Sequence, residues 1–75
     1  MIIQQLSVFL EDKTGRITEM TRILADHNIN ISAFSIADAS EYGIVRMIVS
    51  DPVQAKSILK TNGFSVNITE VVALI

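Results

Sequence analysis

The sequence contains no cysteine and no tryptophan, and it has a single proline and a single histidine among its 75 residues. Without cysteine the chain cannot form disulfide bonds, and one histidine alone cannot build the usual zinc site of cysteine and histidine ligands. A domain this small buries only about 60% of the surface that its unfolded chain exposes. We therefore expect residues 1–75 to form one domain that gains stability from a partner subunit.

Long apolar runs and basic clusters are also missing. No run approaches the roughly 18 apolar residues that a membrane helix needs, and the N-terminus lacks the basic region and cleavage site of a signal peptide. The formal net charge is -2 and the isoelectric point is about 5.1, whereas nucleic-acid-binding domains carry a clustered basic face. The composition predicts a cytoplasmic protein that binds neither nucleic acid nor a membrane.

The chain is instead rich in apolar residues, which make up 49% of the sequence and give a mean hydropathy of +0.44. These values are high for a small domain, because the average of roughly 45–50% apolar residues already includes glycine. Exposed apolar patches usually mark interfaces. We therefore expect a homodimer or a higher homo-oligomer.

The spacing of apolar residues predicts a strand followed by a helix in the first third of the chain. Apolar and polar residues alternate over residues 3–10, as in a half-buried strand. Apolar residues then recur at helical spacing from Thr14, the expected N-cap, to about His27. The side chains expected to face the core are Leu6, Val8, Leu10, Ile17, Met20, Ile23 and Leu24.

Two further strands are predicted in the middle of the chain. Residues 29–37 alternate in character, and residues 44–49 form a nearly continuous β-branched run that suits a strand covered on both faces. A turn over residues 38–43 separates the two runs.

A second helix and a last strand complete the chain. Asp51 and Pro52 begin the helix, with proline at the tolerated first position. Asn62 and Gly63 end it, since glycine is the usual residue after a helix C-terminus. An apolar stretch over residues 66–75 predicts the fourth strand.

The order βαββαβ predicts a ferredoxin-like α+β sandwich, with an antiparallel sheet and both helices on one face. By alternation, the other face of the sheet carries Gln5, Ser7 and Phe9 from the first strand. We expect the second strand to add Phe34 and Ile36 to this uncovered face. We infer that this face, or the edge of the second strand, packs on a partner chain.

Arg46 lies within the predicted third strand. A charged side chain there needs either a partner or access to water. An ion pair with Glu70 across strands is one option, and an edge that is open to water is the other.

Residues 10–17, with the sequence Leu-Glu-Asp-Lys-Thr-Gly-Arg-Ile, form a turn between the first strand and the first helix. The amides of residues 14–17 lie at a helix N-terminus, where they suit a carboxylate. Asp12 and the Asn30 side chain suit an ammonium group, and Gly15 permits close approach of the backbone to a ligand. The turn thus matches a zwitterionic amino acid, although Gly15 has a second interpretation in which it only shapes the turn.

The motif at residues 10–17, followed by Asn-Ile-Asn-Ile-Ser at residues 28–32, resembles the ACT domain over essentially the whole chain. The turn is also similar to that of the small regulatory subunit of acetolactate synthase. The resemblance implies an effector site that joins an acidic or amide residue and a glycine of this turn to an Asn-Ile pair from a partner subunit. With the neighbouring residues of the turn, the expected ligand-binding residues are Asp12, Thr14, Gly15, Arg16, Asn30 and Ile31.

Two positions depart from the family pattern. Acetolactate-type subunits tend to carry an amide where Asp12 stands, and many ACT domains carry proline where Thr14 stands. An acidic Asp12 attracts an ammonium group and repels a carboxylate, so it would select the orientation of the ligand.

The resemblance implies a regulatory module and not an enzyme, with no catalytic residues, metal or cofactor. We predict that a free amino acid binds at a subunit interface and allosterically controls a separate metabolic enzyme in trans. A second similar domain after this one is a further possibility, because the sequence ends in an apolar strand. The alternative is a ligand-free ferredoxin-like dimerisation module, such as that of a transcription regulator.

Overall fold

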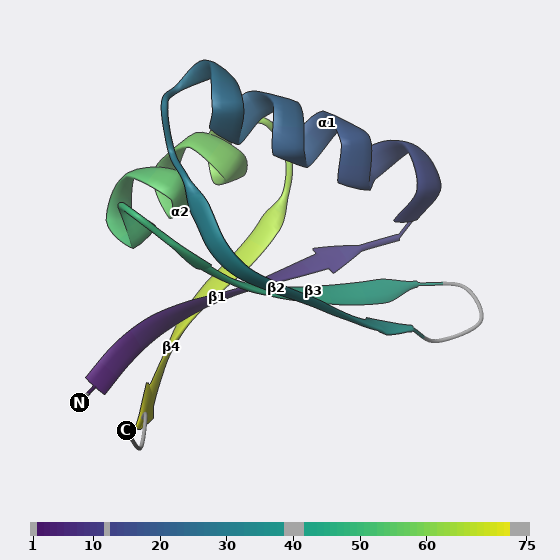
Figure 1. Cartoon of the computed structure of the whole chain (residues 1–75). Coiled ribbons are helices and arrows are strands. Elements are labelled where there is room, and N and C mark those ends of the chain that lie inside the picture. Colours follow the sequence, from purple (N-terminus) through teal and green to yellow (C-terminus); the bar gives the residue numbers. More distant parts are fainter. Residues whose placement is uncertain (1, 12, 39–41, 73–75) are drawn as a thin grey trace.

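The computed structural model describes residues 2–11, 13–38 and 42–72. Both helices lie on one side of the sheet, so the predicted ferredoxin-like sandwich is confirmed (Figure 1). Neither helix in these ranges is long and apolar enough to cross a membrane. The elements are β1 (Ile2–Leu10), α1 (Lys13–Asp26), β2 (Ile31–Asp38), β3 (Gly43–Val49), α2 (Pro52–Thr61) and β4 (Ser65–Val72).

The sheet has the strand order β2-β3-β1-β4, and all of its neighbouring strands are antiparallel. The first strand of the chain therefore lies in the interior of the sheet, between β3 and β4. The two edges are formed by β2 and β4. An edge strand presents backbone groups that can pair with another chain, so the position of β2 bears directly on assembly.

The core lies between the sheet and the two helices. Every second residue is buried in β3 and, from Leu6 onward, in β1, and α1 and α2 each contribute residues spaced by one helical turn. The pattern confirms the core-facing residues predicted for the first strand and helix, with Ile17 and Ile23 at its margin. The buried residues are Leu6, Val8, Leu10, Met20, Leu24, Ile29, Val45, Met47, Val49, Ala55, Leu59, Phe64 and Val66.

The start of α1 differs from the sequence-based prediction. The helix begins at Lys13, so Thr14 lies inside its first turn and is not the N-cap. The prediction was wrong because threonine satisfies the N-cap preference but does not exclude a start two residues earlier.

The two helices end in the same way. After α1, Asn28 adopts a left-handed φ of 58°, and the N–H of Ile29 donates to the carbonyl of Leu24 at 2.9 Å. After α2, Gly63 has a φ of 87° and the N–H of Phe64 makes the equivalent bond at 2.9 Å. These are Schellman motifs, in which the residue after the left-handed position packs into the core. Ile29 and Phe64 are accordingly buried.

The start of α2 follows the prediction. The Asp51 carboxylate accepts a hydrogen bond from the backbone N–H of Gln54 at 3.2 Å, and Pro52 occupies the first helical position. This cap satisfies an amide that has no partner within the helix, and the proline lacks an N–H at a position where none is needed.

The predicted placement of Phe34 and Ile36 on the uncovered sheet face is wrong. The register of β2 shifts over residues 31–33, after which Phe34 aligns with Met47 and Ile36 aligns with Val45. Directly paired residues of antiparallel strands point to the same face. Both side chains therefore lie on the helix side of the sheet, yet on this edge strand they are 43% and 44% exposed.

The third strand is covered on one face only, contrary to the expectation of two covered faces. Val45, Met47 and Val49 are buried, whereas Ile44 and Ile48 are only partly buried. A continuous β-branched run is compatible with either environment, because such residues fit any pleated surface.

The suggested ion pair between Arg46 and Glu70 does not form, because the two residues lie on opposite faces. Arg46 aligns with Ser7 on β1, while Glu70 aligns with Gln4. Ser7 and Gln4 are three residues apart on one strand, so their side chains point in opposite directions. Arg46 is instead exposed to solvent on the face without helices.

Packing against the sheet should dominate the stability of α1. We expect Leu24→Ala to lower the free energy of unfolding by about 2–5 kcal/mol, because it leaves a cavity in the core. Val53→Ala removes a side chain that is 67% exposed and should change stability by less than about 0.5 kcal/mol. Urea unfolding of both variants tests this, and a similar loss for the two would contradict the assignment of the core.

Candidate functional site

Gly15 belongs to the first turn, residues 10–17, which is predicted to hold the ligand. It lies inside α1, and a Cβ atom added there would meet no atom within 4 Å. Among the described glycines, the left-handed φ belongs to Gly63 and not to Gly15. Neither a close neighbour among the described residues nor a left-handed backbone therefore requires glycine at this position.

The other predicted ligand-binding residues of the turn are Asp12, Thr14 and Arg16. Asp12 lies outside the described residues, and the backbone of Thr14 belongs to the first turn of α1. Arg16 follows one residue after Gly15 and has a well-defined set of contacts.

Arg16 extends from α1 to the turn between α2 and β4. Its guanidinium carbon lies 3.8 Å from the centre of the Phe64 ring, and Nη1 donates to the Glu19 carboxylate at 2.8 Å. Nη2 lies 3.8 Å from the point where a Cβ on Gly63 would stand. A cation over an aromatic face gains electrostatic attraction, and the ion pair fixes the guanidinium plane. The side chain is therefore held in place although it is 31% exposed.

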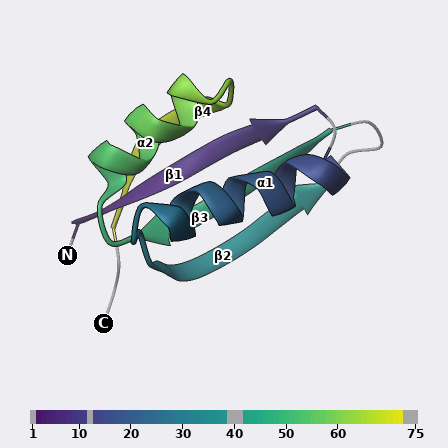
Figure 2. The same ribbon diagram turned by 90° about the horizontal axis from the view of Figure 1, so that it is seen from above.

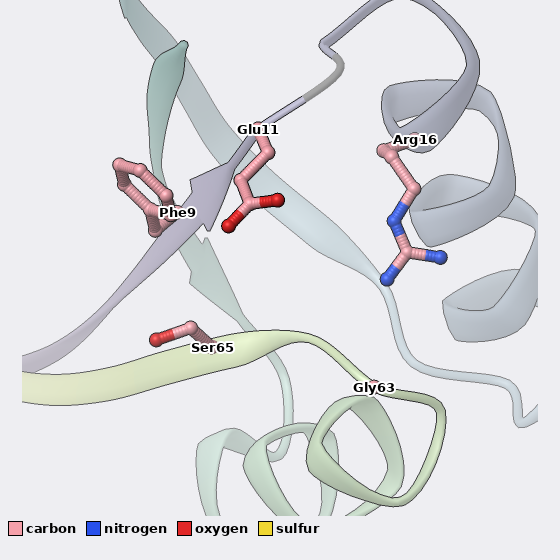
Figure 3. A pocket seen from close by; sticks show the side chains of 5 residues that line it. All are labelled: Phe9, Glu11, Arg16, Gly63 and Ser65. Carbon is pink, nitrogen blue, oxygen red and sulfur yellow. The ribbon is translucent and has the colours of Figure 1, made fainter.

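A hollow of about 260 Å³ lies beside Arg16, at the end of β1 and the start of β4 (Figure 3). In the close-up the Glu11 carboxylate and the Arg16 guanidinium both extend toward this space. The Phe9 ring forms one side of it and packs against Tyr42, with 5.2 Å between ring centres. The lining residues are Phe9, Glu11, Arg16, Gly63 and Ser65.

Sequence reasoning included Arg16 in the candidate site but left out the other four lining residues. Gly63 and Ser65 are about 50 positions away from the first turn in the sequence. They come close because β4 pairs with β1, with Ser65 aligned with Phe9. No local sequence pattern predicts that Ser65 aligns with Phe9, although the predicted sheet topology brings the two strands together.

Asn30 and Ile31, the other half of the predicted site, lie at the start of β2. Two hydrogen bonds join Asn30 to Ser50. The backbone N–H of Asn30 donates to the Ser50 Oγ at 3.1 Å, and the backbone N–H of Ser50 donates to the Asn30 carbonyl at 2.9 Å. The residue is exposed, so its side chain is available at the surface. A second hollow of about 480 Å³ lies here, lined by Thr21, Ala25, Asn28, Ile29, Asn30 and Ile31.

The two halves of the predicted site lie at opposite ends of α1. This helix has 14 residues and at 1.5 Å per residue is about 21 Å long. One small amino acid cannot span that length. Within a single chain the fold therefore does not bring the first turn and Asn30 together.

The described residues contain polar and charged groups suited to binding a small molecule. Opposite charges line the first hollow, and an exposed amide borders the second. Among residues 2–11, 13–38 and 42–72, no group of three histidine, cysteine, aspartate or glutamate side chains is arranged to hold a metal ion.

Solved structures with the same fold include proteins named for the ACT domain. Protein BT0572 from Bacteroides thetaiotaomicron has 56% sequence identity and a TM-score of 0.90, over 93% of this chain and 49% of that one. The ACT domain of prephenate dehydrogenase from Bacillus anthracis has 28% identity and a TM-score of 0.76, over 84% and 99%. An ACT domain protein from Streptococcus pneumoniae, at 19% identity and a TM-score of 0.65 over 92% and 89%, supports the fold alone.

The chain spans about half the length of the Bacteroides protein. No curated protein matches the sequence. A family model described as an ACT domain pair matches residues 1–75, and ACT domains are generally regulatory modules that bind ligands. The match covers the full sequence and agrees with the observed fold, so this chain belongs to the ACT domain family.

Proposed function

We propose that this domain is a regulatory module that binds a free amino acid between two copies of the fold and controls a metabolic enzyme in trans. The separation of the candidate residues by α1 carries the proposal. Asn30 and Ile31 can meet the first turn only if they come from a second copy.

The sheet register supports this arrangement. Leu10, the last residue before the first turn, aligns with Gly43, and Gly43 also aligns with Asp38 at the end of β2. The first turn and the C-terminal end of β2 therefore lie at the same end of the sheet. Figure 2 shows the N-terminal end of α1 above the tip of the β2 arrow.

A second β2 strand, added antiparallel along the free edge, would complete the site. Its N-terminal end would lie beside the C-terminal end of the first β2, since antiparallel strands run in opposite directions. Asn30 and Ile31 of the second copy would then approach the first turn. A two-fold axis would generate the same site twice.

The exposed apolar residues of β2 favour the same contact. Phe34 and Ile36 lie on the helix side of this edge strand and are 43% and 44% exposed. Pairing two β2 strands would bring these side chains together and remove them from water, which is favourable for apolar surface.

The chemistry of the ligand follows from the groups at this interface. The amides at the start of α1 suit a carboxylate, because they have no partner within the helix. Asp12 of one copy and the Asn30 amide of the other would receive the ammonium group. Gly15 would allow the ligand to lie against the helix backbone, and Thr14, Arg16 and Ile31 would border it.

The second copy has two possible sources. It is a separate chain in a homo-oligomer, or a second domain in the same polypeptide, in keeping with the family description as a domain pair and with the longer Bacteroides relative. A ligand that contacts both copies stabilises the paired state, which provides the allosteric coupling. The exposed β2 edge also favours the alternative function, a ligand-free dimerisation module.

Ligand binding is tested by thermal unfolding at a fixed protein concentration with each of the common amino acids. The effector at about 100 times its dissociation constant should add roughly 2.7 kcal/mol, on the order of ten degrees in the midpoint for a domain of this size. Asn30→Ala should remove the shift. A flat panel would favour the dimerisation module.

Gly15→Ala should separate stability from binding in the same assay. It should raise the free energy of unfolding without ligand by about 0.5–1 kcal/mol, because alanine is the better helix former and its Cβ meets no neighbour. It should also reduce the shift caused by the effector. Ser57→Ala on the exposed surface of α2 is the control and should keep the full shift. An unchanged shift in Gly15→Ala would remove this residue from the proposed site.

Assembly is tested by Phe34→Lys, which places a charge on the proposed β2 interface. Light scattering after size exclusion should give a smaller mass than for the unmodified chain, because the charge would be buried without a partner. Val53→Lys makes the same change at an exposed position on α2 and should leave the mass unchanged. An oligomer that survives Phe34→Lys would exclude this interface.

A further inference from the structure

The sequence contains four asparagines, and one of them is followed by glycine. Asn28, Asn30 and Asn67 each precede an isoleucine, whereas Asn62 precedes Gly63. Asparagine is chemically labile because the backbone nitrogen of the next residue can attack the side-chain amide carbon. A branched side chain on that next residue hinders the attack, whereas glycine has no Cβ to hinder it. Asn62 is therefore the most reactive asparagine of the unfolded chain.

We propose that Asn62 is a deamidation site that the native end of α2 protects. The backbone nitrogen of Gly63 loses its proton and forms a bond to Asn62 Cγ, the Cγ–Nδ2 bond breaks, and ammonia leaves. This step closes a five-membered succinimide ring. One water molecule then opens the ring and gives aspartate or isoaspartate. The reaction needs neither a second copy nor an amino-acid ligand, so it is independent of the proposed function.

The backbone of Asn62 is turned away from the geometry of this ring. Asn62 is the C-cap of α2, with a φ of -92° and a ψ of 14°. At this ψ the Gly63 nitrogen almost eclipses the backbone nitrogen of Asn62. In the succinimide ring it must instead eclipse Cβ, which is a different substituent of the tetrahedral Cα. The native conformation thus keeps the attacking nitrogen away from Asn62 Cγ.

Hydrogen bonds hold both reacting groups in this conformation. Nδ2 of Asn62 donates to the Ile58 carbonyl at 2.8 Å. The N–H of Gly63 donates to the Lys60 carbonyl at 3.0 Å, and its proton is the one that the reaction must remove. Asn62 and Gly63 are both exposed, so water reaches them. The geometry of the helix end, and not burial, therefore protects Asn62.

Phe64 anchors the turn between α2 and β4, where Figure 3 labels Gly63. Gly63 has a left-handed φ of 87°, and the N–H of Phe64 donates to the Leu59 carbonyl at 2.9 Å. The Phe64 side chain is buried, and its ring lies 3.8 Å from the Arg16 guanidinium carbon. A large change in the ψ of Asn62 would redirect the chain and remove Phe64 from the core. Deamidation of the native protein therefore requires local opening of this turn.

The products do not fit the turn in which they form. Aspartate lacks the Nδ2 donor to the Ile58 carbonyl and adds a negative charge at a helix C-terminus, where the helix dipole disfavours it. Isoaspartate adds a methylene group to the main chain before Gly63, which displaces the Phe64 N–H from the Leu59 carbonyl. Deamidation would therefore convert a transient opening of the helix end into a permanent loss of stability.

The test compares deamidation of the full chain in native buffer and in guanidinium chloride, at one temperature and one mildly alkaline pH. Incubation in water labelled with heavy oxygen, followed by peptide mass spectrometry, identifies each asparagine that has reacted. In denaturant, Asn62 should react at least about tenfold faster than Asn28, Asn30 or Asn67, because each of those precedes a β-branched residue. In native buffer, Asn62 should react at least about tenfold more slowly than in denaturant, because opening the folded turn costs free energy.

Phe64→Leu tests the anchor of the turn without changing Asn62 or Gly63. It should raise the rate at Asn62 several-fold in native buffer and leave the rate in denaturant unchanged, with circular dichroism to verify that the variant is folded. Val53→Ala changes a side chain at the other end of α2 that is 67% exposed, and it should keep both rates. Asn62→Gln should not react, because its longer side chain cannot form the five-membered ring.

The outcomes decide each part of the proposal. Equal rates in native buffer and denaturant would overturn the protection by the native turn. Comparable rates at all four asparagines in denaturant would overturn the choice of Asn62. A native rate that Phe64→Leu leaves unchanged would exclude Phe64 as the anchor. Deamidated protein separated by ion exchange should unfold at a lower temperature than the unreacted chain, and an equal midpoint would contradict the predicted loss of stability.

Discussion

The antiparallel pairing of β1 with both β3 and β4 determines where every candidate site lies. It places the first strand in the interior of the sheet, brings Ser65 beside Phe9, and leaves β2 at a free edge. The two helices cover the face that carries Leu6, Val8 and Leu10. At that edge Phe34 and Ile36 remain in contact with water.

Both candidate sites lie at helix ends, where the backbone has groups that the helix cannot satisfy. The Schellman motif after α1 directs Ile29 into the core and presents Asn30 at the surface. The equivalent motif after α2 directs Phe64 into the core, where its ring supports Arg16. The same local structure therefore anchors β2 at one position and orders a charged side chain at the other.

Much of the fold could be predicted from residue spacing. The alternation in β1, the Asp51–Pro52 start of α2 and the glycine at its end all act through local backbone geometry, and all three are confirmed. Phe34 and Ile36 were assigned to the wrong face because a register shift of one residue reverses the side of every later side chain. The predicted Arg46–Glu70 ion pair was wrong for a similar reason, since the β1 residues that align with the two side chains point to opposite faces of the sheet.

The sequence by itself determined the element order and the core stripe of the first helix, because both depend on residue spacing within a short stretch of chain, and its motifs carried the family resemblance. It also singled out the first turn and Asn30 as candidate binding residues. Only the tertiary structure decided that α1 separates these two positions, that β2 forms an edge, and that Arg16 lies over Phe64 beside Glu11 and Ser65. Strand pairing joins residues far apart in the chain, and its register depends on the packing of the whole sheet against the helices.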